Sequence, residues 1–122
     1  MFVLDTNILI LYLRKDPLVS EWLEKHILHG ERFTISILSV TELFSYPALQ
    51  DSERLSIDQF LRDMLILELD MSIARLAARY RREHKLKTVD ALIAATAYIL
   101  HATLVTRDFA FKKLGKSAVI IL

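Results

Sequence analysis

The sequence contains no cysteine, and only two glycines and two prolines occur among its 122 residues. The absence of cysteine excludes a disulfide framework and a thiolate zinc site. With so little glycine and proline, little of the chain can be linker or low-complexity sequence, and no internal repeat is present. A long apolar run is also missing, because the longest, residues 91–100, is roughly half of what a bilayer crossing requires.

Neither sign of charge dominates the chain. Its 16 basic and 15 acidic residues give a formal net charge of +1, so binding of nucleic acid would need a local basic surface. No basic leader precedes the first apolar run, which Asp5 interrupts, and we expect no signal peptide and a cytoplasmic location. The hydrophobic content of 53% excludes disorder and, at this length, predicts one domain over 1–122 with a genuine core.

Short apolar or β-branched runs alternate with helical patterns along the whole chain. Strands are predicted over 1–5, 33–38, 66–69, 103–105 and 118–122. Helices are predicted over 6–14, 17–30, 39–46, 51–64, 70–84, 89–101 and 109–114. Strands that alternate with helices favour a parallel sheet covered on both faces. The expected fold class is therefore α/β, a three-layer α/β/α domain with a central parallel sheet of four to five strands.

Four carboxylates stand where one predicted element meets the next: Asp5, Glu42, Asp90 and Asp108. Each has a purely structural explanation. Asp5 and Asp108 could cap the helices that follow them. Glu42 comes three residues after Ser39, a spacing that fits a capping box. Asp90 falls in the first turn of a helix capped by Thr88, where the helix dipole favours a negative charge.

Three of these acids together indicate more than capping. Asp5, Glu42 and Asp108 each closely follow a predicted parallel strand, so all three should project from the sheet edge where open α/β folds bind ligands. Crowded carboxylates repel by roughly 4 kcal/mol per close pair unless a cation offsets the charge. An all-oxygen donor set suits Mg²⁺ or Mn²⁺. The residues thus predict an acidic metal pocket with three members, and no strand places Asp90 in it.

Four stretches resemble the acidic motifs of the PIN domain family, in order and at compatible spacing, over essentially the whole chain. They are VLDTN at 3–7, SVTE at 39–42, TVDALIAATA at 88–97, which is the most specific, and LVTRDFAF at 104–111. The resemblance implies a PIN-like nuclease domain, a Mg²⁺- or Mn²⁺-dependent endoribonuclease most like the toxin of a VapBC-type toxin–antitoxin pair. Its expected partners are RNA as substrate, a cognate antitoxin protein and a second copy of the chain in a homodimer, with no membrane.

The resemblance also implies roles for particular residues. Asp5, Glu42, Asp90 and Asp108 would form the catalytic, metal-binding quartet, with Asp5 and Asp90 as direct ligands. Asn7 and Thr106 would be supporting polar groups that hold carboxylates or phosphate.

Basic side chains should rim an acidic pocket that binds RNA. Lys85, Lys87 and Arg107 are nearest in sequence to the acids, with Arg14 and Lys15 as further candidates, although any of them could equally be solvated surface. The stripe of Arg75, Arg79 and Arg82 is expected to face solvent. Three aromatic side chains on early apolar helices belong either to the core or to a groove for an antitoxin: Tyr12, Trp22 and Phe44.

Three other functions remain open at this point. A PIN fold without catalysis would be an RNA- or protein-binding module. A phospho-acceptor receiver domain would use an Asp after a central strand, such as Asp70, but needs a late Lys where this chain has Thr106-Arg107-Asp108. An acid-nucleophile phosphohydrolase needs a D-x-D motif, and this chain has Asp5-Thr6-Asn7 instead.

Overall fold

The computed structural model describes all residues from 1 to 122. The elements follow one another as β1 (Phe2–Leu4), α1 (Thr6–Leu13), α2 (Pro17–Leu28), β2 (Phe33–Ser36), α3 (Ile37–Phe44), α4 (Asp51–Leu61), β3 (Leu65–Leu67), α5 (Met71–His84), α6 (Thr88–Ile99), β4 (Thr103–Thr106), the 3₁₀-helix η1 (Phe109–Leu114) and β5 (Val119–Ile121). No helix is both long and apolar enough to cross a membrane.

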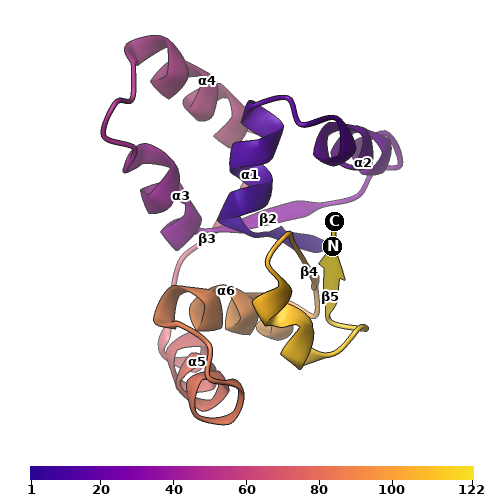
Figure 1. Ribbon diagram of the computed structural model, residues 1–122, viewed down its shortest axis with the longest axis vertical. Coiled ribbons are helices and arrows are strands. Elements are labelled where there is room, and N and C mark those ends of the chain that lie inside the picture. The colour runs from indigo at the N-terminus through magenta and orange to yellow at the C-terminus, as the bar shows by residue number, and fades with distance from the viewer.

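The five strands form one parallel sheet in the order β3-β2-β1-β4-β5. Helices α1 to α4 cover one face, and α5, α6 and η1 cover the other (Figure 1). The predicted three-layer α/β/α fold is confirmed, with five strands in the sheet. The central strand β1 pairs with β2 on one side and β4 on the other, so the segments that follow these three strands emerge side by side at one sheet edge.

Two apolar clusters hold the layers together, one on each face of the sheet. Successive strand residues point to opposite faces, so Val3 joins the cluster beneath α5 and α6 whereas Leu4 joins the one beneath α1 to α4. The first cluster contains four buried alanines of α6, which let α5 and the sheet approach that helix closely: Ala91, Ala94, Ala95 and Ala97. Complete burial of each larger side chain stabilises the fold by roughly 1.5–3 kcal/mol.

Two helix starts differ from the prediction. Strand β2 ends at Ser36, whose hydroxyl accepts a hydrogen bond from Leu38 N at 3.2 Å and caps α3. A capping box between Ser39 and Glu42, the structural explanation for Glu42, is therefore excluded, because Ser39 already lies inside the helix. The apolar pair at 37–38 resembles strand by composition, but the Ser36 cap turns it into the first helical turn. Helix α6 begins at Thr88, with Lys87 rather than Thr88 in the cap position.

Candidate active site

Asp5 stands directly after the central strand and is only 6% exposed. Thr6 N donates to its Oδ1 at 2.8 Å, so Asp5 does cap α1, and the Thr106 hydroxyl donates to its Oδ2 at 2.7 Å. Burial raises the pKa of Asp5 from its ordinary 3.8 to about 6, against the lowering effect of these two hydrogen bonds. The charges of Asp90 and Glu42 add to the rise. Asp5 is thus both a helix cap and the buried centre of an acidic cluster.

Thr106 organises one side of this cluster. Its hydroxyl donates its single hydrogen to Asp5 and accepts from Asp108 N at 3.0 Å and from Asn7 Nδ2 at 3.4 Å. Asn7 Oδ1 accepts from Arg107 N at 3.2 Å, which sets the orientation of the Asn7 amide. Asn7 and Thr106 therefore lie beside Asp5 and hold it through a chain of hydrogen bonds.

A second hydroxyl pair holds Glu42, an exposed residue of α3. The Thr6 hydroxyl lies 2.9 Å from Glu42 Oε1 and 3.0 Å from the Ser39 hydroxyl. Because an ionised carboxylate only accepts, Thr6 donates to Glu42 and the completely buried Ser39 donates to Thr6. Neither residue was singled out for this role from the sequence. The position of Thr6 directly beside Asp5 is the only signal that could have indicated it.

Asp90 and Asp108 complete the cluster from two further elements. Asp90 lies in the first turn of α6, which packs on β1 and β4. Burial raises the pKa of Asp90, and the nearby charges of Asp108 and Glu42 raise it further, while Lys87 lowers it. Asp108 Oδ1 accepts from Ala110 N at 2.8 Å and so caps η1, as the structural explanation predicts. Asp90 therefore lies within electrostatic reach of the other three acids, and Asp5 also lies within reach of Glu42.

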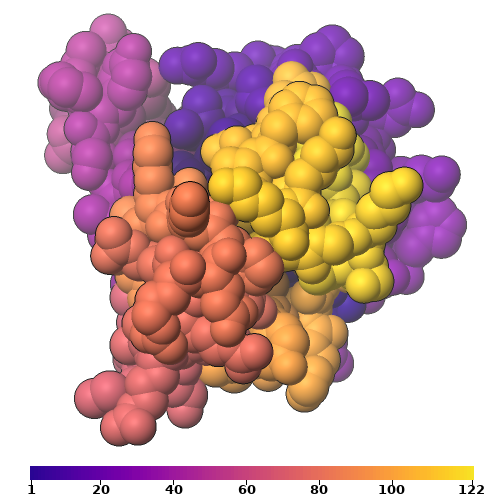
Figure 2. Space-filling view, turned by 60° about the horizontal axis from the view of Figure 1, so that its bottom comes forward, coloured from indigo at the N-terminus to yellow at the C-terminus, as the bar shows by residue number.

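The donor set suits a hard divalent cation in kind, since it consists of carboxylates with hydroxyl and amide oxygens beside them. The spacing is wider than coordination requires, because no three His, Cys, Asp or Glu side chains converge closely enough to hold an ion. The surface is hollowed where the indigo amino-terminal region shows between the violet α3–α4 region, the orange segment around the start of α6 and the yellow carboxyl-terminal region (Figure 2).

The basic residues predicted to rim the site differ in their surroundings. Lys87 is exposed and close enough to Asp90 to lower the pKa of that carboxyl, whereas Lys85 is exposed at the end of α5. The Arg107 guanidinium makes a two-pronged ion pair with Asp16, Nη2 to Oδ2 at 3.2 Å and Nη1 to Oδ1 at 3.4 Å. Asp16 also caps α2 by accepting from Val19 N, so Arg107 is committed to a structural contact that sequence reasoning missed.

The remaining candidates lie outside the acidic cluster. Arg75, Arg79 and Arg82 are exposed, and Arg79 pairs with Glu83 at 2.9 Å along the same helix face. The aromatic candidates Tyr12, Trp22 and Phe44 are half-buried and pack against the cluster beneath α1 to α4. Trp22 contacts Phe2 edge-on, with 5.1 Å between ring centres.

A parallel α/β/α fold with acidic side chains at one sheet edge is the arrangement expected of a PIN-like nuclease domain, and comparison with known families agrees with this class. The chain belongs to the PIN domain family, whose model matches residues 2–117. It is 34% identical over 113 residues to Ribonuclease VapC19 of Mycobacterium tuberculosis, covering 88% of this chain and 89% of that protein. The predicted family is thereby confirmed.

Solved structures share the fold over nearly the full length. A chain in a toxin–antitoxin complex from Klebsiella pneumoniae matches with a TM-score of 0.83 and 27% identity, covering 98% of this chain and 96% of that one. A chain of DNA-bound VapBC from Salmonella typhimurium matches with the same TM-score of 0.83 at 22% identity, again covering 98% and 96%.

Membership of the PIN domain family removes the receiver and phosphohydrolase alternatives. The structure agrees for the receiver, which would need its acceptor Asp after a central strand. Asp70 instead follows the edge strand β3 and caps α5 by accepting from Ile73 N at 2.9 Å.

Proposed function

We propose that this protein is a divalent-metal-dependent endoribonuclease whose reaction depends on Asp5, Glu42, Asp90 and Asp108. The observation that carries the proposal is the burial of Asp5 beside Asp90 and Glu42, whose charges add to the rise in its pKa. Such repulsion at the ligand-binding edge of a parallel sheet is tolerated where a cation binds. The name of the 34% identical relative, a ribonuclease, supports the choice of RNA as substrate.

Asp5 and Asp90 are the proposed direct ligands of Mg²⁺ or Mn²⁺, with Glu42 and Asp108 completing the set, and binding would require these side chains to converge more closely than they do in this structure. Such an ion, when bound, lowers the pKa of the water that attacks a phosphodiester and offsets charge on the leaving oxygen. Thr6 N and the Thr106 hydroxyl each hold one oxygen of Asp5, which keeps that carboxylate in a single orientation. The Thr6 hydroxyl does the same for Glu42.

Basic groups at the rim would bring the RNA backbone to the acids. Lys87 is the first candidate because it lies beside Asp90, and Lys85 is two residues before it. Arg107 would have to leave Asp16 to contact a phosphate, so we expect it to contribute less than either lysine.

The biological role we propose is that of a toxin restrained by a cognate antitoxin, with the toxin itself forming a homodimer. The similarity to a chain of a toxin–antitoxin complex supports this role. We expect a small reading frame for a DNA-binding protein next to this gene. Its protein product should co-purify with the chain and block RNA cleavage. Light scattering on the isolated chain tests the homodimer.

The activity is tested on the purified protein with single-stranded RNA, Mn²⁺ or Mg²⁺, and a chelator in parallel. Cleavage should require the ion and disappear in Asp5→Asn and Asp90→Asn. The matched control is Glu24→Gln, because Glu24 is an exposed acid of α2 outside the cluster, and this variant should cleave like the wild type. Cleavage that persists in chelator contradicts metal dependence. Absence of cleavage with every divalent ion would favour a non-catalytic binding module on the PIN fold.

A further inference from the structure

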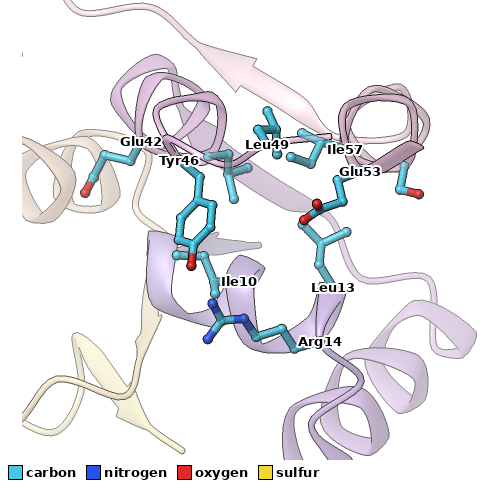
Figure 3. Close-up of a pocket in the computed structure, with 10 residues that line it drawn as sticks. Ile10, Leu13, Arg14, Glu42, Tyr46, Leu49, Glu53 and Ile57 are labelled. Atoms are coloured by element: carbon cyan, nitrogen blue, oxygen red, sulfur yellow. The ribbon is translucent and has the colours of Figure 1, made fainter. Parts of the chain in front are cut away.

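A pocket of about 260 Å³ opens beside the acidic cluster, between α1, α3 and α4 (Figure 3). Six of its ten lining residues are apolar, among them Ile10, Leu43 and Ile57. Glu42 lines this pocket and also belongs to the acidic cluster, so a group bound in the pocket lies next to the proposed site of cleavage.

Two side chains give the pocket its binding character. Tyr46 stands four residues after Glu42, just beyond the carboxyl end of α3, and 57% of it is exposed. Arg14 comes from the end of α1 and makes no ion pair and no side-chain hydrogen bond within the chain. Figure 3 shows the Arg14 guanidinium and the hydroxyl end of Tyr46 turned toward each other across the pocket. An aromatic ring and an unpaired guanidinium are therefore available to a ligand, in a pocket whose other polar lining residues are Glu42, Glu53 and Ser56.

The chemistry of these groups matches that of an unstacked nucleobase. Single-stranded RNA is bound by stacking its bases on aromatic side chains or guanidinium planes and by hydrogen bonds to their edges. We propose that the pocket binds the base of a nucleotide flanking the scissile phosphate, with Tyr46 packing against the base and Arg14 donating hydrogen bonds to it. This inference rests on the proposed ribonuclease function and adds a substrate subsite to it.

The size of the pocket favours a base over a segment of protein. Its volume of about 260 Å³ lies just below the range for drug-sized ligands, roughly 300 Å³ and upward, and therefore suits one ring-sized group. The other exposed aromatic side chain near the acids, Phe109, already carries Lys112 Nζ at 5.0 Å from its ring centre. Tyr46 is therefore the more available surface for stacking.

The first test compares kcat/KM for a short single-stranded RNA among Tyr46 variants. Tyr46→Ala should lower kcat/KM roughly tenfold, the size of one base–aromatic stack, whereas Tyr46→Phe keeps the ring and should stay close to wild type. Tyr98→Ala is the matched control, because Tyr98 is similarly exposed at 63% but lies near the end of α6 opposite to Asp90. Wild-type kcat/KM in Tyr46→Ala would overturn the proposal and leave the pocket to a protein partner.

The second test removes the base instead of the ring. Once the cleavage position is mapped, abasic nucleotides are placed singly at each flanking position. In the wild type, an abasic nucleotide at one position should lower kcat/KM about tenfold. In Tyr46→Ala the same substitution should lower kcat/KM no further, because the two changes remove the same contact. Equal abasic penalties in both proteins would overturn the proposal.

Binding separates this proposal from the ribonuclease assignment. Fluorescence anisotropy of labelled RNA is measured with Asp5→Asn as the background, with and without Tyr46→Ala or Arg14→Ala. Weaker RNA binding in both double variants supports the subsite, whether or not the wild type cleaves RNA. Absence of cleavage by the wild type would refute only the proposed activity. Unchanged binding in both, in a protein whose wild type cleaves RNA, refutes only the subsite.

Discussion

Replacing Asp5 by Asn should stabilise the protein in chelator at alkaline pH, although Asp5 is a proposed catalytic residue. Burial raises the pKa of Asp5 from 3.8 to about 6, so at pH 8 the fold holds a carboxylate charge in a site that is 6% exposed. The difference between these two pKa values, at 1.36 kcal/mol per unit, means that ionised Asp5 costs about 3 kcal/mol of unfolding free energy. Asn carries no charge and keeps an oxygen for the hydrogen bond from Thr6 N.

Part of this gain is lost because Asn has one acceptor oxygen where Asp has two. The Thr106 hydroxyl loses the partner it has at Asp5 Oδ2, which costs roughly 1 kcal/mol. The net stabilisation expected at pH 8 is therefore about 2 kcal/mol. The pKa of Asp5 is higher in the folded state than in the unfolded state, so the unfolded state loses the proton first as the pH rises. Asp5 therefore does not lower the free energy of unfolding below pH 3.8, and lowers it progressively as the pH rises to about 6. Asp5→Asn should lack this part of the decline.

Urea unfolding followed by circular dichroism, in chelator and at several pH values from acid to alkaline, measures both quantities. Glu24→Gln controls for the removal of one negative charge at an exposed position, and its pH profile should follow the wild type. A wild-type stability that is flat or rises across this range, with an Asn variant no more stable at pH 8, would refute the assignment of Asp5 as a buried, uncompensated charge.

Three further predictions concern the cation, the Thr106 hydroxyl and the sheet. In differential scanning fluorimetry, Mn²⁺ should raise the melting temperature of the wild type more than that of Asp90→Asn, because the variant lacks a proposed ligand. Equal rises would exclude Asp90 as a ligand. Thr106→Val should raise the pKa of the Asp5 carboxyl further, since the Thr106 hydrogen bond lowers it, and an unchanged carboxyl titration by NMR would argue against that bond. Thr34→Val should stabilise the protein by about 1 kcal/mol in urea unfolding, because the buried Thr34 hydroxyl has no hydrogen-bond partner; a loss of stability would mean that this hydroxyl is satisfied in solution.

Local patterns predict the elements well and their starting points less well. The Asp70 cap and the Pro17 start are visible in sequence because capping side chains and proline act within one helical turn. The start of α3 is missed because a β-branched apolar residue, Ile37, favours strand by composition, while the cap that begins the helix belongs to the residue before it.

The candidate site divides in the same way. Asp5 and Asp108 each follow a parallel strand. The alternation of strands with helices along the chain alone predicts that they share a sheet edge, and both lie at that edge in the structure. Asp90 enters the cluster because α6 packs across β1 and β4, a tertiary arrangement that nothing local to residue 90 encodes. In the sequence, only the resemblance to the PIN domain family places Asp90 in the cluster.

Three of the acids, Asp5, Glu42 and Asp108, and the layered α/β fold follow from patterns a few residues long, since strand periodicity, helical periodicity and capping are local effects. The partners of those acids do not. The bond from Thr106 to Asp5 spans 101 residues of sequence, and the bond from Thr6 to Glu42 spans 36. Their geometry depends on which strands pair and which helix covers them, and so does the burial that raises the pKa of Asp5. These features arise only when the chain is folded, because solvent exclusion and long-range hydrogen bonds belong to the packed sheet edge and not to any single segment.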